Sequence, residues 1–302
     1  MKLTYFQGSP PNFGDELNAT MWHHILPKGF FDEDPSTLFI GIGSVIEPKY
    51  PAEARKVVLG SGYGGYTVKP DVKDGMWDIR FVRGPQTAQV LGLDPKLAIA
   101  DSAVLLRETP LPKPATNIGV AFMPHYESIE RGNWQAACDL AGIRFIDPTH
   151  DTDKIISEIL GADLLITEAM HGAIVADAMR TPWIGLRTIH KLHRFKWFDW
   201  AGALNIDYRP VFMFPSNCRE TWALTTGRSG SGPRAKTVLG GKLASPMNFA
   251  LQHMAARRLQ AISKLDPQLS SDQNIERVTT RAMEAVDEFV DEYSARGSAA
   301  CA

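Results

Sequence analysis

The sequence between Asp163 and Leu186 reads DLLITEAMHGAIVADAMRTPWIGL. The opening DLLIT is an apolar run typical of a strand buried on both faces, and GAIVADAM has the spacing of a helix. The pair TP then ends the helix, and WIGL indicates the next buried strand. A strand, a helix and a second strand in so short a stretch predict a βαβ unit of a parallel sheet.

His171 falls where the first of these strands ends and the helix begins. Ligands of open α/β sheets bind at this position, because unpaired N–H groups at helix amino ends favour anions there. A lone histidine at such a point is more often a helix residue tied to a neighbour. Here Thr167 and Glu168 crowd the same turn, which favours a role in a binding or catalytic site.

Length and composition indicate the broad class. The chain has 302 residues, of which 44% are hydrophobic, enough for two domains with a core each. With a net charge of −2, the chain lacks the excess of basic residues that is typical of proteins that bind nucleic acid. Cys138, Cys218 and Cys301 lack metal-ligand spacing and indicate a reducing compartment without disulfides. The sequence shows neither a signal-like segment nor a membrane-spanning run, so we expect a cytoplasmic protein.

A proline-rich segment, TPLPKP at 109–114, divides the chain. Its prolines are incompatible with a central strand or helix and make a stiff spacer. We predict an α/β fold of two Rossmann-like domains, an amino-terminal one over 1–110 and a carboxyl-terminal one over 115–265. Residues 266–302 should contain an acidic amphipathic helix and a disordered tail that begins at Gly297.

Four apolar runs of the first domain predict strands. They are expected at Lys2–Phe6, Ser36–Ile40, Arg55–Leu59 and Asp78–Val82. Glycine clusters after the second and third strands would let backbone approach an anion or a sugar. Neither cluster is a GxGxxG before a convincing helix, and GxxxxGK[ST] is absent, which argues against nicotinamide dinucleotide and P-loop chemistry.

Polar residues follow several of these strands. Asp15, in the segment NFGD, could accept a hydrogen bond from a ligand, although an acidic residue in the first turn of a helix explains it equally well. Arg83 ends the fourth strand, and a guanidinium there can fork onto a carboxylate or phosphate. The alternative for Arg83 is a surface ion pair, but its position matches that of His171. Asp101 stands at the edge of a further apolar run.

His125 follows the strand NIGVAFM of the second domain. It occupies the position that His171 has after its own strand. Two histidines at adjacent strand ends on one sheet edge are stronger evidence for a site than one.

The segment TIHKLHRFKWFDW at 188–200 is basic and aromatic. It fits an amphipathic helix that buries Leu192, Phe195 and Phe198. Because the segment starts at the ligand edge, three nearby cationic residues can face the cleft: Arg187, His193 and Lys196. A later basic segment rich in glycine and serine, at 226–242, is expected to be a mobile loop that orders over an anionic substrate.

Six segments, in this order and spacing, carry a family likeness: Asn12-Phe13-Gly14-Asp15, Gly41-Ile42-Gly43-Ser44, Arg83-Gly84-Pro85-Gln86-Thr87, Ala100-Asp101, Pro124-His125, and EAMHGAIVADA from Glu168. Together they resemble the polysaccharide pyruvyl transferase family, especially the ketal-forming enzymes of bacterial exopolysaccharide synthesis such as the succinoglycan type. The resemblance implies a fold similar to GT-B glycosyltransferases, with the acceptor on the first domain, the donor on the second and the site in the cleft between them. It also implies phosphoenolpyruvate as donor and a pair of hexose hydroxyls as acceptor.

The family's described donor site uses an arginine of the first domain and an Arg-Leu-His run of the second. By this resemblance, Arg83 matches the first arginine and His171 the histidine, while Ala169 stands in place of the second arginine. The missing positive charge is then expected from one of three residues, Arg187, His193 or Lys196.

Ketal formation from a small anionic donor needs cations, a proton for the enol carbon and a base for a hydroxyl. We expect His171 to act as acid or phosphate ligand and His125 as the second acid or base. The other catalytic candidates are Glu168 and Asp101, and the acceptor-binding candidates are Asn12, Asp15, Gly43 and Ser44. This scheme requires neither a metal nor a cofactor.

Two other functions fit the same sequence. A GT-B-like glycosyltransferase that uses a nucleotide sugar would have the same architecture. A non-catalytic glycan-binding homologue would explain Ala169. In the preferred interpretation the acceptor is an exopolysaccharide or its lipid-linked precursor, and the latter would place the protein at the inner face of the membrane.

Overall fold

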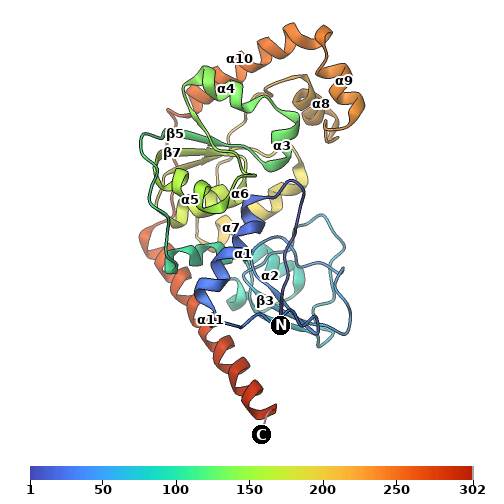
Figure 1. Cartoon of the computed structure of the whole chain (residues 1–302), viewed down its shortest axis with the longest axis vertical. Coiled ribbons are helices and arrows are strands. Elements are labelled where there is room, and N and C mark those ends of the chain that lie inside the picture. The colour runs from blue at the N-terminus through green and yellow to red at the C-terminus, as the bar shows by residue number, and fades with distance from the viewer. Residues whose placement is uncertain (301–302) are drawn as a thin grey trace.

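The structure, a computed structural model, describes the backbone of residues 1–300 and the side chains of residues 1–295. It is a mixed α/β protein with two parallel four-stranded sheets (Figure 1). The first sheet has the order β1-β2-β3-β4 and comprises β1 (Lys2–Leu3), β2 (Thr37–Ile40), β3 (Arg55–Leu59) and β4 (Trp77–Phe81). Helix α1 (Phe13–Ile25) follows β1, and α2 (Pro85–Leu91) follows β4.

The second sheet has the order β6-β5-β7-β8, and helices connect its strands. Its strands are β5 (Gly119–Met123), β6 (Arg144–Phe145), β7 (Ala162–Thr167) and β8 (Trp183–Gly185). Its helices are α3 (Tyr126–Arg131), α4 (Trp134–Ala141), α5 (Thr152–Leu160) and α6 (Met170–Ala178). The predicted βαβ unit is therefore confirmed as β7-α6-β8, with Leu165 paired in parallel to Trp183.

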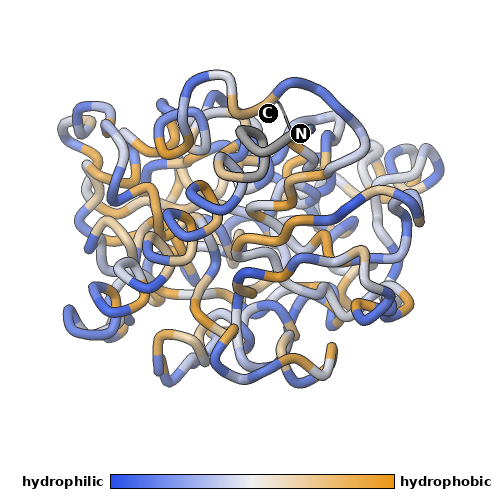
Figure 2. Tube along the Cα trace, turned by 90° about the horizontal axis from the view of Figure 1, so that it is seen from below, coloured by the Kyte–Doolittle hydropathy of each residue, from blue (hydrophilic) through white to orange (hydrophobic). Residues whose placement is uncertain are grey.

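One hydrophobic cluster joins the two sheets. It contains Phe39 and Leu59 of the first sheet together with Met123 and Leu165 of the second. The 3-10 helix η2 (Ser102–Glu108) lies between them and packs on α1 and α6. Figure 2 shows the apolar stretches in the inner strands and hydrophilic loops around them. The parallel sheets that we predicted are present, and they share a core across the proline-rich segment.

The carboxyl-terminal part is helical. It comprises α7 (Arg194–Ala203), α8 (Cys218–Thr226), α9 (Pro233–Leu239), α10 (Ser245–Ile262) and α11 (Asp272–Ala300). Helix α11 buries one face, including Val278, Val286 and Phe289, against the shared core. No helix of the described part of the chain is long and apolar enough to cross a membrane.

Three expectations for this part were wrong. Residues 226–242 contain helix α9, where a loop was expected. Helix α7 buries Trp197 and Trp200, whereas Leu192 and Phe198 are 60% and 43% exposed. Trp197 stacks on Tyr208 and Trp200 packs at a tilt against Trp183, so the larger indole surfaces set the buried face. The backbone of α11 continues through Gly297 to Ala300, where disorder was expected, and residues 301–302 lie outside the described part.

Candidate active site

A polar cavity of about 980 Å³, including space open to solvent, lies where strand ends of both sheets meet. Segments that follow β1, β2, β3, β5, β7 and β8 contribute to its wall. The lining residues are Phe6, Asn12, Asp15, Ser44, Val45, Glu47, Lys49, Tyr66, His125, Tyr126, Glu127, His171, His193 and Lys196. The structure thus brings together these residues that we expected in the site: Asn12, Asp15, Ser44, His125, His171, His193 and Lys196.

His171 is placed by the amino end of α6 and by two close neighbours. Its Nε2 lies 3.5 Å from Oδ2 of Asp101. Asp101 caps η2 by accepting the N–H of Ala103 through Oδ1, which leaves Oδ2 to face the imidazole. On its other edge the ring lies against Gly14, where an added Cβ would come within 1.8 Å of Nδ1. The imidazole is therefore held between a buried carboxylate and the first turn of α1.

We predict that Gly14→Ala displaces His171 and lowers activity by about tenfold or more, since a misplacement of about 1 Å can cost a catalytic site that much. Alanine is the better helix former, so an isolated helix would gain stability from this change. The loss would therefore report the clash with the imidazole. Steady-state kinetics of the folded variant measure it, and Gly232→Ala, where a Cβ meets nothing within 4 Å, is the matched control. Equal rates for the two variants would contradict the placement of His171.

Asp15 lies in the first turn of α1 and is buried. Asn12 donates a hydrogen bond of 2.5 Å to its carboxylate, and Gly43, at a φ of 128°, leaves room beside it. Burial raises the pKa of the Asp15 carboxyl, and the positive charges of His171 and Lys196 oppose this effect. A buried carboxyl with a raised pKa at a cavity wall can exchange a proton with a ligand. Gly43 lies next to the Asp15 carboxylate and does not itself line the cavity.

His125 is buried at the end of β5. The Glu168 carboxylate accepts hydrogen bonds from the backbone N–H of His125 at 3.1 Å and from the Ser128 hydroxyl at 2.6 Å. Glu168 thus holds the turn that carries His125 and does not line the cavity. Burial, followed by the charge of Lys196, moves the pKa of His125 well below its usual value. The imidazole is neutral near pH 7 and can accept a proton or a hydrogen bond.

His193 ends the 3-10 helix η3 (Lys191–His193), and Lys196 lies in the first turn of α7. Burial and the charge of Lys196 lower the pKa of His193 to about 3. Burial and the charge of Arg83 lower the pKa of Lys196 to about 8, although Asp15 opposes the shift. At neutral pH Lys196 is therefore mainly protonated beside neutral imidazoles. This combination suits a small anionic ligand, which would also relieve the repulsion between the cations.

Arg83 lies in the wall behind the cavity and does not line it. Its side chain is fully buried, with Nε 3.0 Å from Oδ2 of Asp199 on α7. The same guanidinium donates to the Ser44 hydroxyl at 2.6 Å and to the Tyr63 carbonyl at 2.8 Å. Arg83 is therefore not the surface ion pair considered above. In this structure it joins α7 to the first sheet and positions Ser44.

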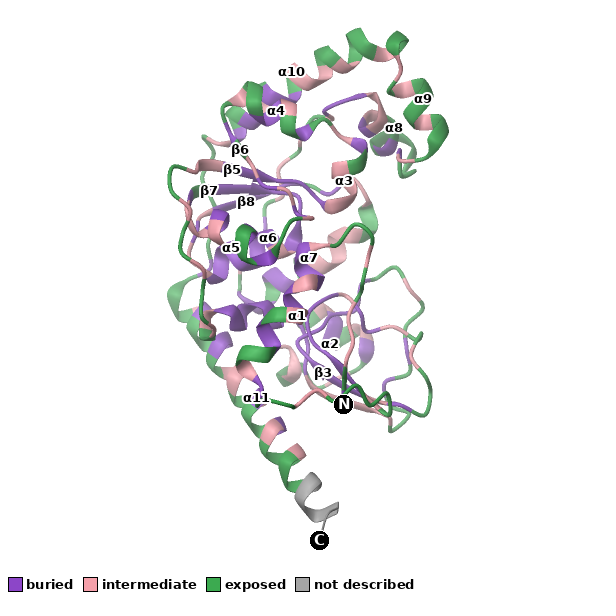
Figure 3. Ribbon diagram, viewed as in Figure 1, coloured by how far each residue is buried: buried purple, intermediate pink, exposed green. Residues whose placement is uncertain are grey.

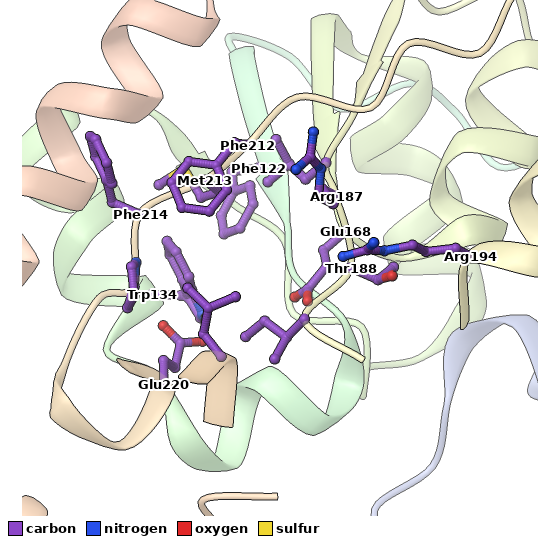
Figure 4. A pocket seen from close by; sticks show the side chains of 14 residues that line it. Phe122, Trp134, Glu168, Arg187, Thr188, Arg194, Phe212, Met213, Phe214 and Glu220 are labelled. Atoms are coloured by element: carbon purple, nitrogen blue, oxygen red, sulfur yellow. The ribbon is translucent and has the colours of Figure 1, made fainter. Parts of the chain in front are cut away.

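Arg187 lies apart from His171, in the wall of a second cavity of about 480 Å³ (Figure 4). This cavity is mainly apolar, with aromatic residues that include Phe122, Trp134 and Phe214. Glu168 lines it as well, so it adjoins the turn that carries His125. The residues expected to bind the donor therefore do not all lie in one cavity. Of the three candidates for the missing positive charge, only His193 and Lys196 line the same cavity as His171.

Several functional candidates were missed from the sequence. Glu127 is central among them, with Oε2 at 3.6 Å from both His125 Nδ1 and Arg131 Nη1 and at 3.7 Å from His190 Nε2. The Arg131 side chain is buried, and its Nε and Nη1 have no hydrogen-bond partner among the described residues. Tyr66, Glu47 and Lys49 also line the cavity. The only sequence signal for Glu127 was its place two residues after His125, and the others come from loops without a motif.

Three side chains of the cavity offer potential metal ligands. The ligand atoms of His125, Glu127 and His193 all lie within 4.8 Å of one another. Lys196 and Arg131 lie close enough to lower the pKa of both imidazoles. Positive charges at this range disfavour a dication and favour an anion.

The fold and this cavity define an α/β enzyme that combines acid–base groups with cations at the ends of parallel strands. Comparison with known proteins gives the family. Residues 12–190 match the family model described as polysaccharide pyruvyl transferase. The chain belongs to this family and is a polysaccharide pyruvyltransferase, as the resemblance predicted.

A curated relative supports this assignment over nearly the whole chain. The sequence is 37% identical over 296 residues to the succinoglycan biosynthesis protein ExoV of Rhizobium meliloti (strain 1021). The alignment covers 90% of this chain and 93% of that protein. The similarity therefore extends beyond the family match, into the carboxyl-terminal helices.

Proposed function

We propose that this enzyme transfers the pyruvyl group of phosphoenolpyruvate to two hydroxyls of a hexose and so forms a pyruvate ketal. The acceptor would be a bacterial exopolysaccharide, in line with the relative's name, which refers to succinoglycan biosynthesis. A lipid-linked precursor of the polysaccharide is the other acceptor that we propose. The observation that carries the donor assignment is the cavity in which His171, His125 and the cationic Lys196 meet. A two-domain, GT-B-like division near residues 109–114, with the acceptor on the first domain, is part of the same proposal.

The reaction requires one proton at the methylene carbon of the donor and the removal of one proton from each hydroxyl. In the proposed sequence, His171 protonates that carbon, supported by Asp101, and the first hydroxyl attacks the cation-like centre after giving its proton to neutral His125. The second hydroxyl then displaces phosphate and its proton leaves with the phosphate. His125 then loses its proton to solvent and His171 regains one, so atoms and charges balance and one inorganic phosphate is released for each ketal formed.

Other groups would bind and orient the two substrates. Lys196 would hold the phosphate or carboxylate of the donor, and Arg131 supplies a second buried positive charge nearby. Asn12, Asp15 and Ser44 line the part of the cavity next to the first sheet, where they could bind sugar hydroxyls. This scheme uses neither a metal nor a cofactor, and we propose that the enzyme works without them.

The function is tested by incubating the enzyme with phosphoenolpyruvate and a β-hexoside and measuring phosphate release and ketal formation. We expect stoichiometric phosphate and ketal. Turnover with a nucleotide sugar alone would instead support the glycosyltransferase. Binding without turnover across a broad acceptor panel would support a glycan-binding homologue.

The lowered pKa of Lys196 predicts how the activity depends on pH. Its pKa is lowered to about 8, so the ammonium is present below that pH and is lost as the pH rises through it. We therefore expect kcat/KM for phosphoenolpyruvate to fall above pH 8 through a rise in KM.

Lys196→Arg should keep the charge at high pH, because a guanidinium stays protonated there, and the alkaline loss should disappear. Lys49→Arg makes the same change elsewhere in the cavity wall and should leave the pH profile of the wild type unchanged. A profile that is identical in the wild type and Lys196→Arg would exclude Lys196 as the titrating donor ligand.

A further inference from the structure

Helices α8, α9 and the amino half of α10 form one end of the molecule, opposite the carboxyl end of α11 (Figure 1). Figure 3 shows that α9 and the start of α10 are mostly exposed. Half of the exposed large apolar side chains in the described part of the chain lie between Phe212 and Met254. Leu243, in the turn between α9 and α10, is 100% exposed, and Val238 and Phe249 are 68% and 64% exposed.

The same region has a strongly positive charge. Between Thr221 and Leu265 the sequence contains no Asp or Glu, although the whole chain has more acidic than basic residues. The basic residues of this stretch are Arg228, Arg234, Lys236, Lys242, Arg257, Arg258 and Lys264. Lys236 pairs with Glu130, whereas Arg228, Arg234 and Lys242 are exposed. Arg257, Arg258 and Lys264 lie farther along, on or after the carboxyl half of α10.

We propose that this surface, formed by α8, α9 and the amino half of α10 and called here the α8–α10 surface, docks on an anionic phospholipid bilayer. Exposed apolar side chains among basic residues are the composition of helices that lie in the membrane interface. Lys242 and Leu243 are adjacent at the tip, so one contact would place the ammonium among phosphates and the leucine among acyl chains.

A second copy of this chain fits the surface less well. A two-fold dimer places the same patch against itself, so basic residues would face basic residues, because Glu220 of α8 is buried and Glu130 already pairs with Lys236. Nucleic acid would satisfy the charge but would leave the apolar side chains in contact with phosphates. A bilayer satisfies both, because its surface is anionic and its interior is apolar.

The inference does not depend on the proposed reaction. It concerns contact with the lipid bilayer itself and would hold for any substrate. If the acceptor is lipid-linked, docking would also concentrate the enzyme where that acceptor lies.

The test is co-sedimentation of the full-length protein with vesicles of phosphatidylcholine alone and of an equal mixture of phosphatidylcholine and phosphatidylglycerol. We expect binding to the mixed vesicles that weakens as salt is added, and little binding to the neutral ones. The double variant Lys242→Glu and Leu243→Ser should reduce partitioning by about tenfold or more. Each basic residue near an anionic membrane strengthens binding by about fivefold, and this variant reverses one such charge. Its activity on a soluble acceptor should match that of the wild type, which separates this test from that of the reaction.

The chain offers a matched control at Val68 and Lys69, an exposed apolar and basic pair in the loop between β3 and β4. The double variant Val68→Ser and Lys69→Glu makes the same chemical changes and should bind vesicles like the wild type. Equal binding by both double variants, or no binding of the wild type to the mixed vesicles, would overturn the proposal. So would a wild-type dimer that the Lys242 and Leu243 changes convert to a monomer without affecting vesicle binding.

Discussion

His171→Asn is expected to lower the rate of pyruvyl transfer by about 10²- to 10⁴-fold, the usual contribution of a positioned acid–base group. The imidazole lies in the cavity wall with Nε2 facing the buried Asp101 carboxylate, which keeps the ring oriented. Asparagine has no titratable proton, so it can bind but cannot protonate the enol carbon. The loss should appear mainly in kcat, measured as phosphate release at saturating donor.

The control for this variant is His24→Asn on the exposed side of α1. Both variants should have the circular dichroism spectrum of the wild type, and only His171→Asn should lose activity. A His171→Asn enzyme that retains its kcat would show that another group donates the proton. Asp15, with its raised pKa in the same cavity, would then be the first candidate.

Asp199→Ala is expected to lower the free energy of unfolding by about 3–5 kcal/mol, the cost of leaving a buried partner charge uncompensated. The Asp199 carboxylate accepts from Arg83 and also from the N–H and hydroxyl of Thr87, at 2.9 and 2.6 Å. Its removal would leave all of these donors buried between α2 and α7. Urea unfolding measures the change.

The matched control is Asp207→Ala, which breaks an exposed Arg–Asp pair. Asp207 is 91% exposed and lies 3.8 Å from Arg209, so this change should cost about 0–1 kcal/mol. If the two variants unfold at the same urea concentration, the Arg83–Asp199 pair does not stabilise the contact of α7 with the first sheet as we argue. The activity of Asp199→Ala should also fall, because α7 carries Lys196 into the cavity.

Local sequence signals predicted most of the elements. The strand Arg55–Leu59 has the expected bounds, and the helices Pro85–Leu91 and Thr152–Leu160 begin and end where local residues favour it. The two helices carry strong end signals: Pro85 starts one and Gly92 ends it in the left-handed region, and Asp151 caps the other. Such signals act within a few residues and can be read without knowledge of the tertiary structure.

The buried face of α7 could not be predicted in this way. Both faces of the segment carry large apolar residues, so periodicity alone does not distinguish Phe198 from Trp197. The choice depends on tertiary contacts: the indoles pack on Trp183 and Tyr208, and Asp199 pairs with Arg83 across 116 residues of sequence. The same long-range pair keeps Arg83 in the wall of the cavity. Its place at the end of a strand had predicted a contact with the ligand instead.

For the candidate site, the rule that ligands bind at strand ends placed His125, His171 and Asp101 close to one another. It works because parallel strands end at a common edge whatever their separation in sequence. The rule does not say which loops turn inward. It therefore missed Glu127 and Tyr66, and it grouped Arg187 with His171 although the two residues line different cavities.

The central claim is that strand ends of both sheets form one pocket for a small, strongly anionic donor. The most direct test is a crystal of the enzyme soaked with phosphoenolpyruvate. We predict electron density for the donor in the polar cavity, in contact with His171 and Lys196. Density in the aromatic cavity beside Trp134 and Arg187, with the His171 cavity empty at a saturating concentration of the donor, would contradict it.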